Sequence, residues 1–188
     1  MENKFNVLFN NALKYGAAMG GVIVLFNLIV YVSGTDLFSI TFSILSFVVV
    51  ISLFIVFFVY SNRNLRDKHF GGQLTYLEGF LNALITGVVA LLITTAYSYL
   101  FFKFFDPEYL QQTMEKTMEM LESNPNIPQD TLDDAYAKIE KMTPEKVAIQ
   151  GLYSNAIISL IFAAIVAAFT KMKAPVFSDE EDEQLKEN

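Results

Sequence analysis

Four long stretches of this chain contain no charged residue and no histidine. They cover residues 15–35, 37–62, 79–102 and 147–170, with lengths of 21, 26, 24 and 24 residues. The hydrocarbon core of a bilayer is about 30 Å thick, and roughly 20 apolar residues of α-helix cross it. Only helices and closed barrels satisfy their backbone hydrogen bonds in lipid, and these runs are far too long for barrel strands. The runs predict an all-α integral membrane protein with four transmembrane helices.

Two other interpretations of the runs fit the sequence less well. A soluble protein would need to bury all four in its core, and the remaining residues of this 188-residue chain are too few to cover them. The first run follows Lys4 and Lys14, as a secretory signal would. Its apolar part is longer than the roughly 7–15 residues of a signal peptide, and no clear small-residue cleavage site follows it. We expect it to remain as the first membrane helix, extended toward the N-terminus by an apolar stripe over residues 5–12.

The placement of lysine and arginine indicates the orientation. The loop after the second run carries Arg63, Arg66 and Lys68, whereas the short loop after the first run carries no basic residue. Basic residues in short loops favour the cytoplasmic side. The long third loop also contains lysines, which weakens the contrast. We expect both termini in the cytoplasm, and the long loop outside.

The segment between the third and fourth runs is acidic and has helical periodicity. Asp106, Pro107 and Glu108 suit a helix start: Asp caps the first turn, Pro fits its first position, and Glu favours the positive end of the dipole. Apolar residues then recur at helical spacing on both sides of a break at 124–128. We expect an extracytoplasmic helical hairpin with helices over 107–123 and 129–142. It is either a solvated spacer or a surface that binds a partner.

These features divide the chain into four predicted segments. They are an N-terminal segment with three membrane helices (1–105), an acidic extracytoplasmic helical loop (106–143), the fourth membrane helix (144–173) and an acidic cytoplasmic tail (174–188). The tail holds six acidic residues and one lysine. Charge runs of this kind are typical of disordered, solvated segments. We therefore expect the tail to be disordered.

The composition restricts the chemistry. The chain has one histidine, His69, and no cysteine, so it lacks thiolate or multi-histidine metal sites and cysteine nucleophiles. It also contains no Ser/His/Asp set and no Gly-rich phosphate loop. We expect no catalytic residue, no bound metal and no cofactor, and hence no enzyme activity. The net charge of −7 argues against nucleic acid as a partner, because phosphate binding needs a basic face.

Small residues recur at four-residue spacing in the first and third runs. In lipid, helices associate where small residues let two backbones approach closely. We predict that these positions pack against other helices: Gly16, Gly20, Gly79, Ala83 and Gly87. The second run has no Gly or Ala over 37–60 and is rich in Phe, Val and Ile. We expect it to be the most lipid-exposed helix, with its Phe and Val side chains mostly facing lipid.

Uncharged polar residues are scattered through the runs: Asn27, Ser46, Ser52, Asn82, Thr86, Thr94, Thr95, Asn155 and Ser159. No charge lies in the middle of any run, although charged residues usually mark ion and proton pathways. We expect the polar side chains to form interhelical hydrogen bonds, and a solute path is the alternative. Glu78 lies at a cytoplasmic helix boundary. It either pairs with a basic residue such as Arg66 or Lys14, or faces headgroups and water.

Three segments in order along the chain resemble a known family. They are YGAAMGG at 15–21, FGGQLTYLEGF at 70–80 and YSYLFFKFFDPEYL at 97–110. Together they resemble the bacterial four-helix membrane proteins of domain-of-unknown-function family 4199, found largely in one phylum of Gram-negative bacteria. The resemblance covers most of residues 10–173. It implies an inner-membrane protein with no assigned activity and supplies no catalytic residue.

The sequence therefore predicts a multi-pass inner-membrane protein whose N- and C-termini are cytoplasmic. Its expected partners are the lipid bilayer and either itself or another membrane protein. We expect a non-enzymatic accessory or interaction protein. The alternative is a small oligomeric transporter or channel, against which the absence of buried charges and of an obvious internal repeat counts.

Overall fold

The computed structural model describes residues 3–35 and 39–172. In chain order its elements are α1 (Lys4–Val32), α2 (Ile40–His69), α3 (Tyr76–Leu100), the π-helical turn η1 (Phe101–Phe105), α4 (Pro107–Glu122), α5 (Gln129–Ile139) and α6 (Pro144–Thr170). Four helices, with η1 continuing α3, are long and apolar enough to cross a membrane. The prediction of an all-α membrane protein with four spanning helices is therefore confirmed. The tail predicted at 174–188 lies outside the described residues.

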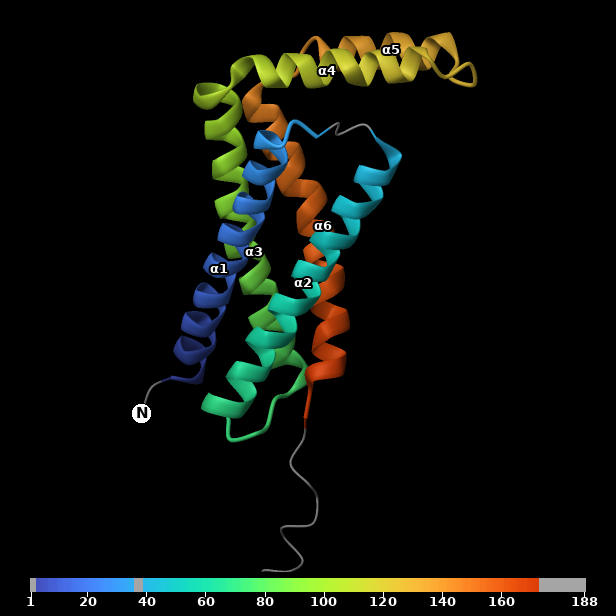
Figure 1. The fold of residues 1–188 in the computed structure, drawn as a ribbon. Coiled ribbons are helices and arrows are strands. Elements are labelled where there is room, and N and C mark those ends of the chain that lie inside the picture. Colours follow the sequence, from blue (N-terminus) through green and yellow to red (C-terminus); the bar gives the residue numbers. More distant parts are fainter. Residues whose placement is uncertain (1–2, 36–38, 173–188) are drawn as a thin grey trace, which may run out of the picture.

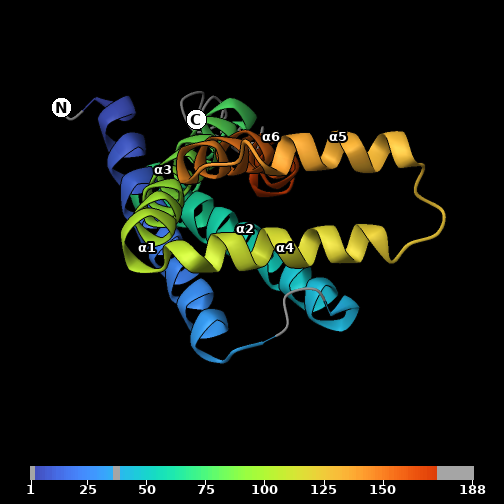
Figure 2. The ribbon, with the colours of Figure 1, turned by 90° about the horizontal axis from the view of Figure 1, so that it is seen from above.

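The four membrane helices form a bundle, and α4 and α5 lie across one end of it (Figure 1). Helix α3 is central, because it packs extensively against both α1 and α6. Helix α2 approaches the others at the end that leads into α3 and leans away from α1 toward the α4–α5 end (Figures 1 and 2). The N-terminus lies at the end opposite α4 and α5. The bundle therefore has one tightly packed end and one where α1 and α2 diverge.

Helix α2 is the least buried of the four membrane helices. Only 11% of its most apolar stretch is buried, against 39% in α3, so its predicted exposure is confirmed for the helix as a whole. Phe47 and Val48, for example, are exposed. The prediction is wrong for Phe54 and Phe58, which are 2% and 0% exposed and pack edge to face at 5.6 Å. These large rings fill space that small residues leave on α3, where a Cβ at Gly87 would lie 3.1 Å from Phe58.

Helices α1 and α3 approach closely at two glycines of α1. A Cβ atom added at Gly16 would lie 2.6 Å from the backbone oxygen of Thr86 and 2.7 Å from the Cβ of Val89. A Cβ at Gly20 would lie 3.0 Å from the Cβ of Ile93. Real Cβ atoms keep longer distances from such neighbours, so the α1–α3 spacing at Gly16 exists only because the side chain is a hydrogen atom.

The small residues of α3 lie against α2 and α6. A Cβ at Gly87 would overlap the hydroxyl of Ser159 on α6, and one at Gly79 would lie 3.2 Å from the Nδ2 atom of Asn62 on α2. Ala83, between them, is fully buried in the apolar core of the bundle. That core is made of Met19, Phe54, Phe58, Ala83, Ala90, Ala163 and Val166. The small face of α3 therefore contacts α2 and α6, while its opposite side receives the glycines of α1.

The end of α6 is held beside the start of α3 by backbone hydrogen bonds. The Leu74 N–H donates to the Met172 carbonyl at 2.9 Å, and the Met172 N–H donates to the Leu74 carbonyl at 2.8 Å. One residue later, Thr75 and Glu78 form a reciprocal cap at the first turn of α3. The loop between α2 and α3 is thus anchored to α6 as well as to α3.

Glu78 has a different charged partner from those expected. Its carboxylate lies 3.8 Å from the Lys4 ammonium at the start of α1, so pairing with a basic residue is confirmed, although that residue is neither Arg66 nor Lys14. Arg66 instead pairs with the neighbouring Asp67 at 2.6 Å. Lys4 is 80% exposed, and exposed ion pairs contribute about 0–1 kcal/mol. The cap formed with Thr75 is therefore the more important role of Glu78.

Helix α3 leaves the bundle through η1, and the chain then turns into α4. Asp106 caps α4 and Pro107 occupies its first turn, as the sequence predicts. Helix α4 ends at Glu122 and α5 runs from Gln129 to Ile139. The second helix expected here, over 129–142, thus ends three residues early. Thr143 caps the next helix at Pro144, so residues 140–143 are needed for the connection.

The close approach at Gly16 gives a matched test on one helix. Gly16→Ala should lower the free energy of unfolding by about 1–3 kcal/mol, the usual cost of overpacking. Gly21→Ala should be neutral or stabilise by up to about 1 kcal/mol, because a Cβ there meets no atom within 4 Å and Ala favours helix. Thermal unfolding in detergent measures both. Equal effects of the two substitutions would contradict this packing of α1 on α3.

Candidate functional site

Six buried polar side chains meet near the packed end of the bundle. They are Asn11 of α1, Ser61 and Asn62 of α2, Asn82 and Thr86 of α3, and Thr170 of α6. None is more than 6% exposed. Every membrane helix contributes at least one member to this set, which we call the polar network.

Asn82 is at the centre of the polar network. Its Oδ1 atom accepts a hydrogen bond from Asn11 at 3.0 Å, and its Nδ2 atom donates to Ser61 Oγ at 2.7 Å and to Asn62 Oδ1 at 2.9 Å. Asn11 also donates to the backbone oxygen of Ser61 at 3.0 Å. One amide on α3 therefore binds both α1 and α2 directly.

A further bond extends the polar network to α6. The Nδ2 atom of Asn62 donates to the hydroxyl of Thr170 at 2.8 Å, and that hydroxyl donates to the carbonyl of Val166 in its own helix, also at 2.8 Å. On the other side, the hydroxyl of Thr86 lies 3.2 Å from the hydroxyl of Ser61 on α2 and donates to the carbonyl of Asn82 in its own helix at 2.7 Å. Such fully bonded side chains join helices in lipid, where apolar contact alone gives little gain. The polar network therefore holds the four membrane helices together at the packed end.

Four other polar residues predicted to bond across helices do not do so within the described part of the chain. Asn82 and Thr86 belong to the polar network, but Thr94 and Asn155 bond only to backbone carbonyls of their own helices. The Oγ atoms of Ser46 and Ser159 are buried without a partner among the described residues. The prediction of interhelical bonds is thus confirmed for Asn82 and Thr86 and wrong for these four. Sequence reasoning also missed Asn11, Ser61, Asn62 and Thr170 as network members.

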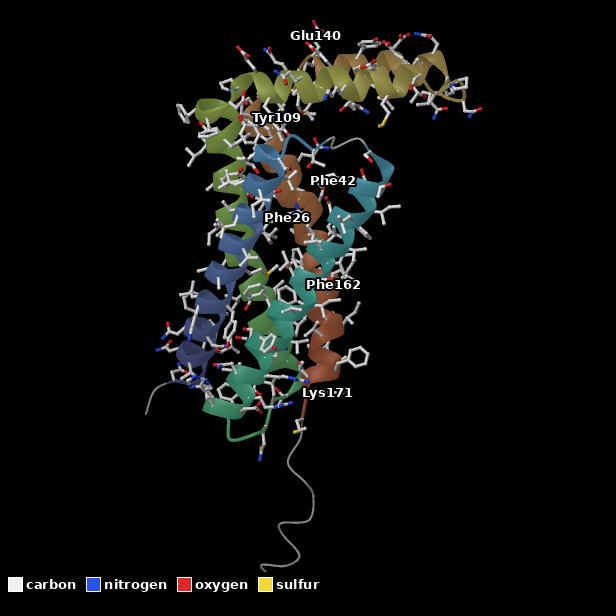
Figure 3. All side chains as sticks on the ribbon, viewed as in Figure 1. Phe26, Phe42, Tyr109, Glu140, Phe162 and Lys171 are labelled. Carbon is white, nitrogen blue, oxygen red and sulfur yellow. The ribbon has the colours of Figure 1, made fainter. Side chains whose placement is uncertain are left out.

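Tyr31, near the end of α1, ties α4 to the bundle. Its hydroxyl donates to Asp106 Oδ2 at 2.7 Å, while Asp106 Oδ1 accepts from the backbone N–H of Tyr109 at 3.0 Å. The Tyr31 ring packs edge-on against Phe101 and Tyr109, with centroids 4.9 and 5.2 Å away. Burial, and secondarily the Asp106 carboxylate, raises the pKa of the Tyr109 phenol. Figure 3 shows Tyr109 where α4 meets the end of α1.

A second tie joins the exit of α3 to the start of α6. The Lys103 ammonium on η1 lies 3.0 Å from the Glu145 carboxylate. Both side chains are partly exposed, so the pair adds little stability but orients the two segments. Since Tyr31 and Lys103 act at the two ends of the segment 107–139, that segment has a defined position across the bundle. We call it the α4–α5 platform.

The platform contains a groove of about 460 Å³ between its two helices. Its apolar lining comes from Met114 and Met118 of α4 and from Tyr136 and Ile139 on the α5 side. Met118 is buried, whereas Tyr136 is 45% exposed. In Figure 2 the two helices run side by side and extend past the bundle. The apolar faces that the sequence predicts on these helices therefore leave an open groove between them.

Acidic residues border the groove. Glu115, Glu119 and Glu122 line it from α4, and Glu140 lines it just after α5. None of its eight lining residues is basic. Glu140 lies on the face of the platform that is turned away from the bundle (Figure 3). The groove thus combines an apolar floor with a negative rim, an arrangement suited to an apolar segment flanked by cations.

The described residues contain no group of three or more His, Cys, Asp or Glu side chains placed to hold a metal ion. The single histidine, His69, is exposed at the last position of α2. The groove carboxylates are spread along 26 residues of chain, from 115 to 140.

One comparison with known proteins gave a match. The model of a family described as "Protein of unknown function (DUF4199)" matches residues 14–172. The chain belongs to this family. The residues matched by the DUF4199 model include the platform, all of α2, α3 and α6, and α1 from residue 14 onward. No curated protein and no solved structure matches the chain, so the DUF4199 assignment brings no activity with it.

In this DUF4199 chain the bond between α2 and α6 can be tested with isosteric substitutions. Thr170→Val removes the acceptor of Asn62, and interhelical hydrogen bonds in membranes contribute about 0.6 kcal/mol on average and up to about 1.7 kcal/mol. We expect a loss in this range. Thr94→Val is the control, because Thr94 bonds only to Leu91 of its own helix. Thermal unfolding in detergent should separate the two variants, and a Thr94→Val loss as large as that of Thr170→Val would refute the assignment.

Proposed function

We propose that this protein is a non-enzymatic inner-membrane protein that acts by association, with the α4–α5 platform as its recognition surface. In this proposal the platform is an extracytoplasmic helical hairpin, and both termini are cytoplasmic. The observation that carries the proposal is the groove between α4 and α5, with its apolar floor and glutamate rim. The partner is another membrane or envelope protein that presents an apolar helix flanked by lysine or arginine.

The charge distribution supports this orientation. Arg63, Arg66 and Lys68 lie at the end of α2 opposite the platform, and Lys171 lies at that same end (Figure 3). The residues from 106 to 145 hold ten acids and three lysines, a net charge of −7. Basic residues in short loops favour the cytoplasm, whereas acidic residues contribute little to orientation. The platform end is therefore assigned to the outside.

The same charges argue for a protein partner over the membrane surface. The platform lies across the bundle and runs along the membrane plane, so its apolar groove could in principle face lipid. The net charge of −7 over residues 106–145 would be repelled by anionic headgroups. A helix that places apolar side chains in the groove and cations beside the rim gains from both features.

The alternative of a small transporter or channel has weaker support. The polar network joins all four helices at the packed end, and its members are at most 6% exposed. A solute that crossed the bundle would have to break these bonds. Enzyme activity also has little support, because the chain has no cysteine and a single histidine.

The orientation can be tested by labelling single cysteines, since the chain has none of its own. Lys68→Cys and Asn126→Cys place exposed thiols at opposite ends of the bundle. In cells with a permeabilised outer membrane, an impermeant maleimide should label position 126 and leave position 68 unlabelled until the inner membrane is broken. Labelling of position 68 alone in intact inner membranes would overturn the orientation.

The groove can be tested by removing its charge without changing its shape. The triple variant Glu115→Gln, Glu119→Gln, Glu122→Gln should reduce recovery of a stoichiometric partner from crosslinked native membranes roughly ten-fold, equivalent to about 1.4 kcal/mol. The control is Asp130→Asn, Asp133→Asn, Asp134→Asn, which neutralises three acids of α5 outside the groove lining. We expect the control to retain the partner.

Two outcomes would count against association through the groove. Equal loss from both triple variants would mean that overall charge, and not the groove, binds the partner. Absence of any stoichiometric partner, combined with solute flux through proteoliposomes of the purified protein, would favour the transporter alternative.

A further inference from the structure

A second cavity, of about 210 Å³, lies between the membrane helices in the half of the bundle nearer the platform. Its polar lining consists of the carboxamides of Asn27 and Asn155 and the hydroxyls of Thr94, Thr95 and Ser98. Helix α2, which leans away from α1 toward this end (Figures 1 and 2), contributes the apolar side chains Val50 and Phe54. No lining residue is charged. The cavity is therefore amphipathic and electrically neutral.

The polar groups of this cavity are not paired across helices. Asn155 Nδ2 donates to the carbonyl of Gly151 at 2.8 Å, within α6. The side chains of Asn27, Thr95 and Ser98 have no hydrogen-bond partner among residues 3–35 and 39–172. Asn27 is exposed at the surface of the bundle and Thr95 and Ser98 are half-buried, so the cavity opens to the surroundings of the helices, where lipid tails supply no hydrogen-bond partner. These side chains are therefore available to bond to the polar groups of an occupant.

The polar side chains around the cavity differ from those of the polar network in their hydrogen bonding. Both sets consist of amides and hydroxyls, but those of the cavity come only from α1, α3 and α6. The side chains of the polar network bond across helices. Around the cavity, Asn27, Thr95 and Ser98 have no partner among the described residues, and Thr94 and Asn155 bond only within their own helices. Interhelical bonding explains the first set and does not explain the second.

Gly151 lies beside the cavity and does not contact a neighbouring helix as Gly16 and Gly87 do. It lines the cavity, yet a Cβ added there would meet no atom within 4 Å. At Gly16 and Gly87 an added Cβ would collide with a neighbouring helix. Helix contact therefore requires glycine at 16 and 87 but not at 151, where its effect is to leave room in the cavity.

We propose that this cavity binds a neutral group rich in hydroxyl or ester oxygens, such as the glycerol region of an uncharged lipid. A charged group would lose its hydration without finding a counter-charge, which is costly. A hydroxyl group can accept from the Asn27 amide nitrogen and donate to the amide oxygens, and an ester oxygen can accept from the hydroxyls of Thr95 and Ser98, while an attached chain packs on Val50 and Phe54 of α2. The volume suits a group of several water-sized units, since one water occupies about 30 Å³. This site is separate from the groove and stands whether or not the groove binds a protein.

The same chemistry could come from the bilayer or from solution, and three probes separate these sources. Purified full-length protein in detergent is titrated with dioctanoylglycerol, with glycerol at the same molar concentrations, and with the anionic lipid dioctanoylphosphatidylglycerol. Because a ligand that binds the folded state raises its stability, the midpoint of thermal unfolding reports binding. We expect a saturating rise with dioctanoylglycerol and none with the anionic lipid.

Matched variants show whether the response comes from this cavity. Gly151→Leu should fill it and raise the half-saturating concentration of dioctanoylglycerol at least roughly ten-fold, the effect of losing about 1.4 kcal/mol of binding. Gly21→Leu, equally open but outside the lining, should respond like the wild type. Combining Thr95→Val with Ser98→Ala removes two unpaired hydroxyls with little change in volume, and should weaken the response without closing the cavity.

Each outcome decides the proposal. A saturating response to glycerol as well, lost in Gly151→Leu, would support the site and assign it to a free polyol. An equal response of Gly151→Leu and Gly21→Leu would overturn the proposal, as would an equal response to the anionic lipid or no saturating response to either neutral probe. The result does not depend on the platform, because none of these variants lies in the groove.

Discussion

The hydrogen bonds of Asn82 are the interaction on which this bundle depends. Lipid tails are as apolar as the side chains of the helices, so helix contact in a membrane gains little from the hydrophobic effect. Asn82, fully buried, bonds to Asn11 on α1 and to Ser61 and Asn62 on α2. These bonds need close backbones, and Gly79 allows that approach beside Asn62. Glycine at position 79 therefore supports the polar bonding as well as the packing of the helices.

The position of the polar network explains why the bundle is packed closely at one end and more open at the other. It holds α2 at the end near the loop to α3, and α2 is free to lean away at the other end, where the neutral cavity lies. The platform is held separately, by Tyr31 on α1 and by Lys103 beside Glu145. The groove thus keeps its place over the bundle even though α2 contributes little to that end. Rigidity at one end and openness at the other follow from where the polar side chains are paired.

Much of the fold follows from the sequence, because uncharged runs and a capped acidic segment have few structural solutions. The sequence could not distinguish Phe54 and Phe58, which are buried, from Phe47, which is exposed, since all three have the same hydropathy. Asn11 and Thr170 were missed because they lie at the margins of the apolar segments, although both continue buried faces of α1 and α6. The groove and the cavity depend on distances between helices, and no sequence periodicity contains those distances.

The polar network has a consequence for how the protein responds to its surroundings. It consists only of amides and hydroxyls, which neither gain nor lose a proton in the physiological range. The uncharged runs likewise place no fixed charge in the field across the bilayer, where each elementary charge would otherwise contribute about 2.3 kcal/mol per 100 mV. Acidification or a change in membrane voltage therefore leaves the interior of the bundle unaltered. The carboxylates that border the groove lie outside the membrane helices, and in the proposed orientation they are on the outer face of the membrane.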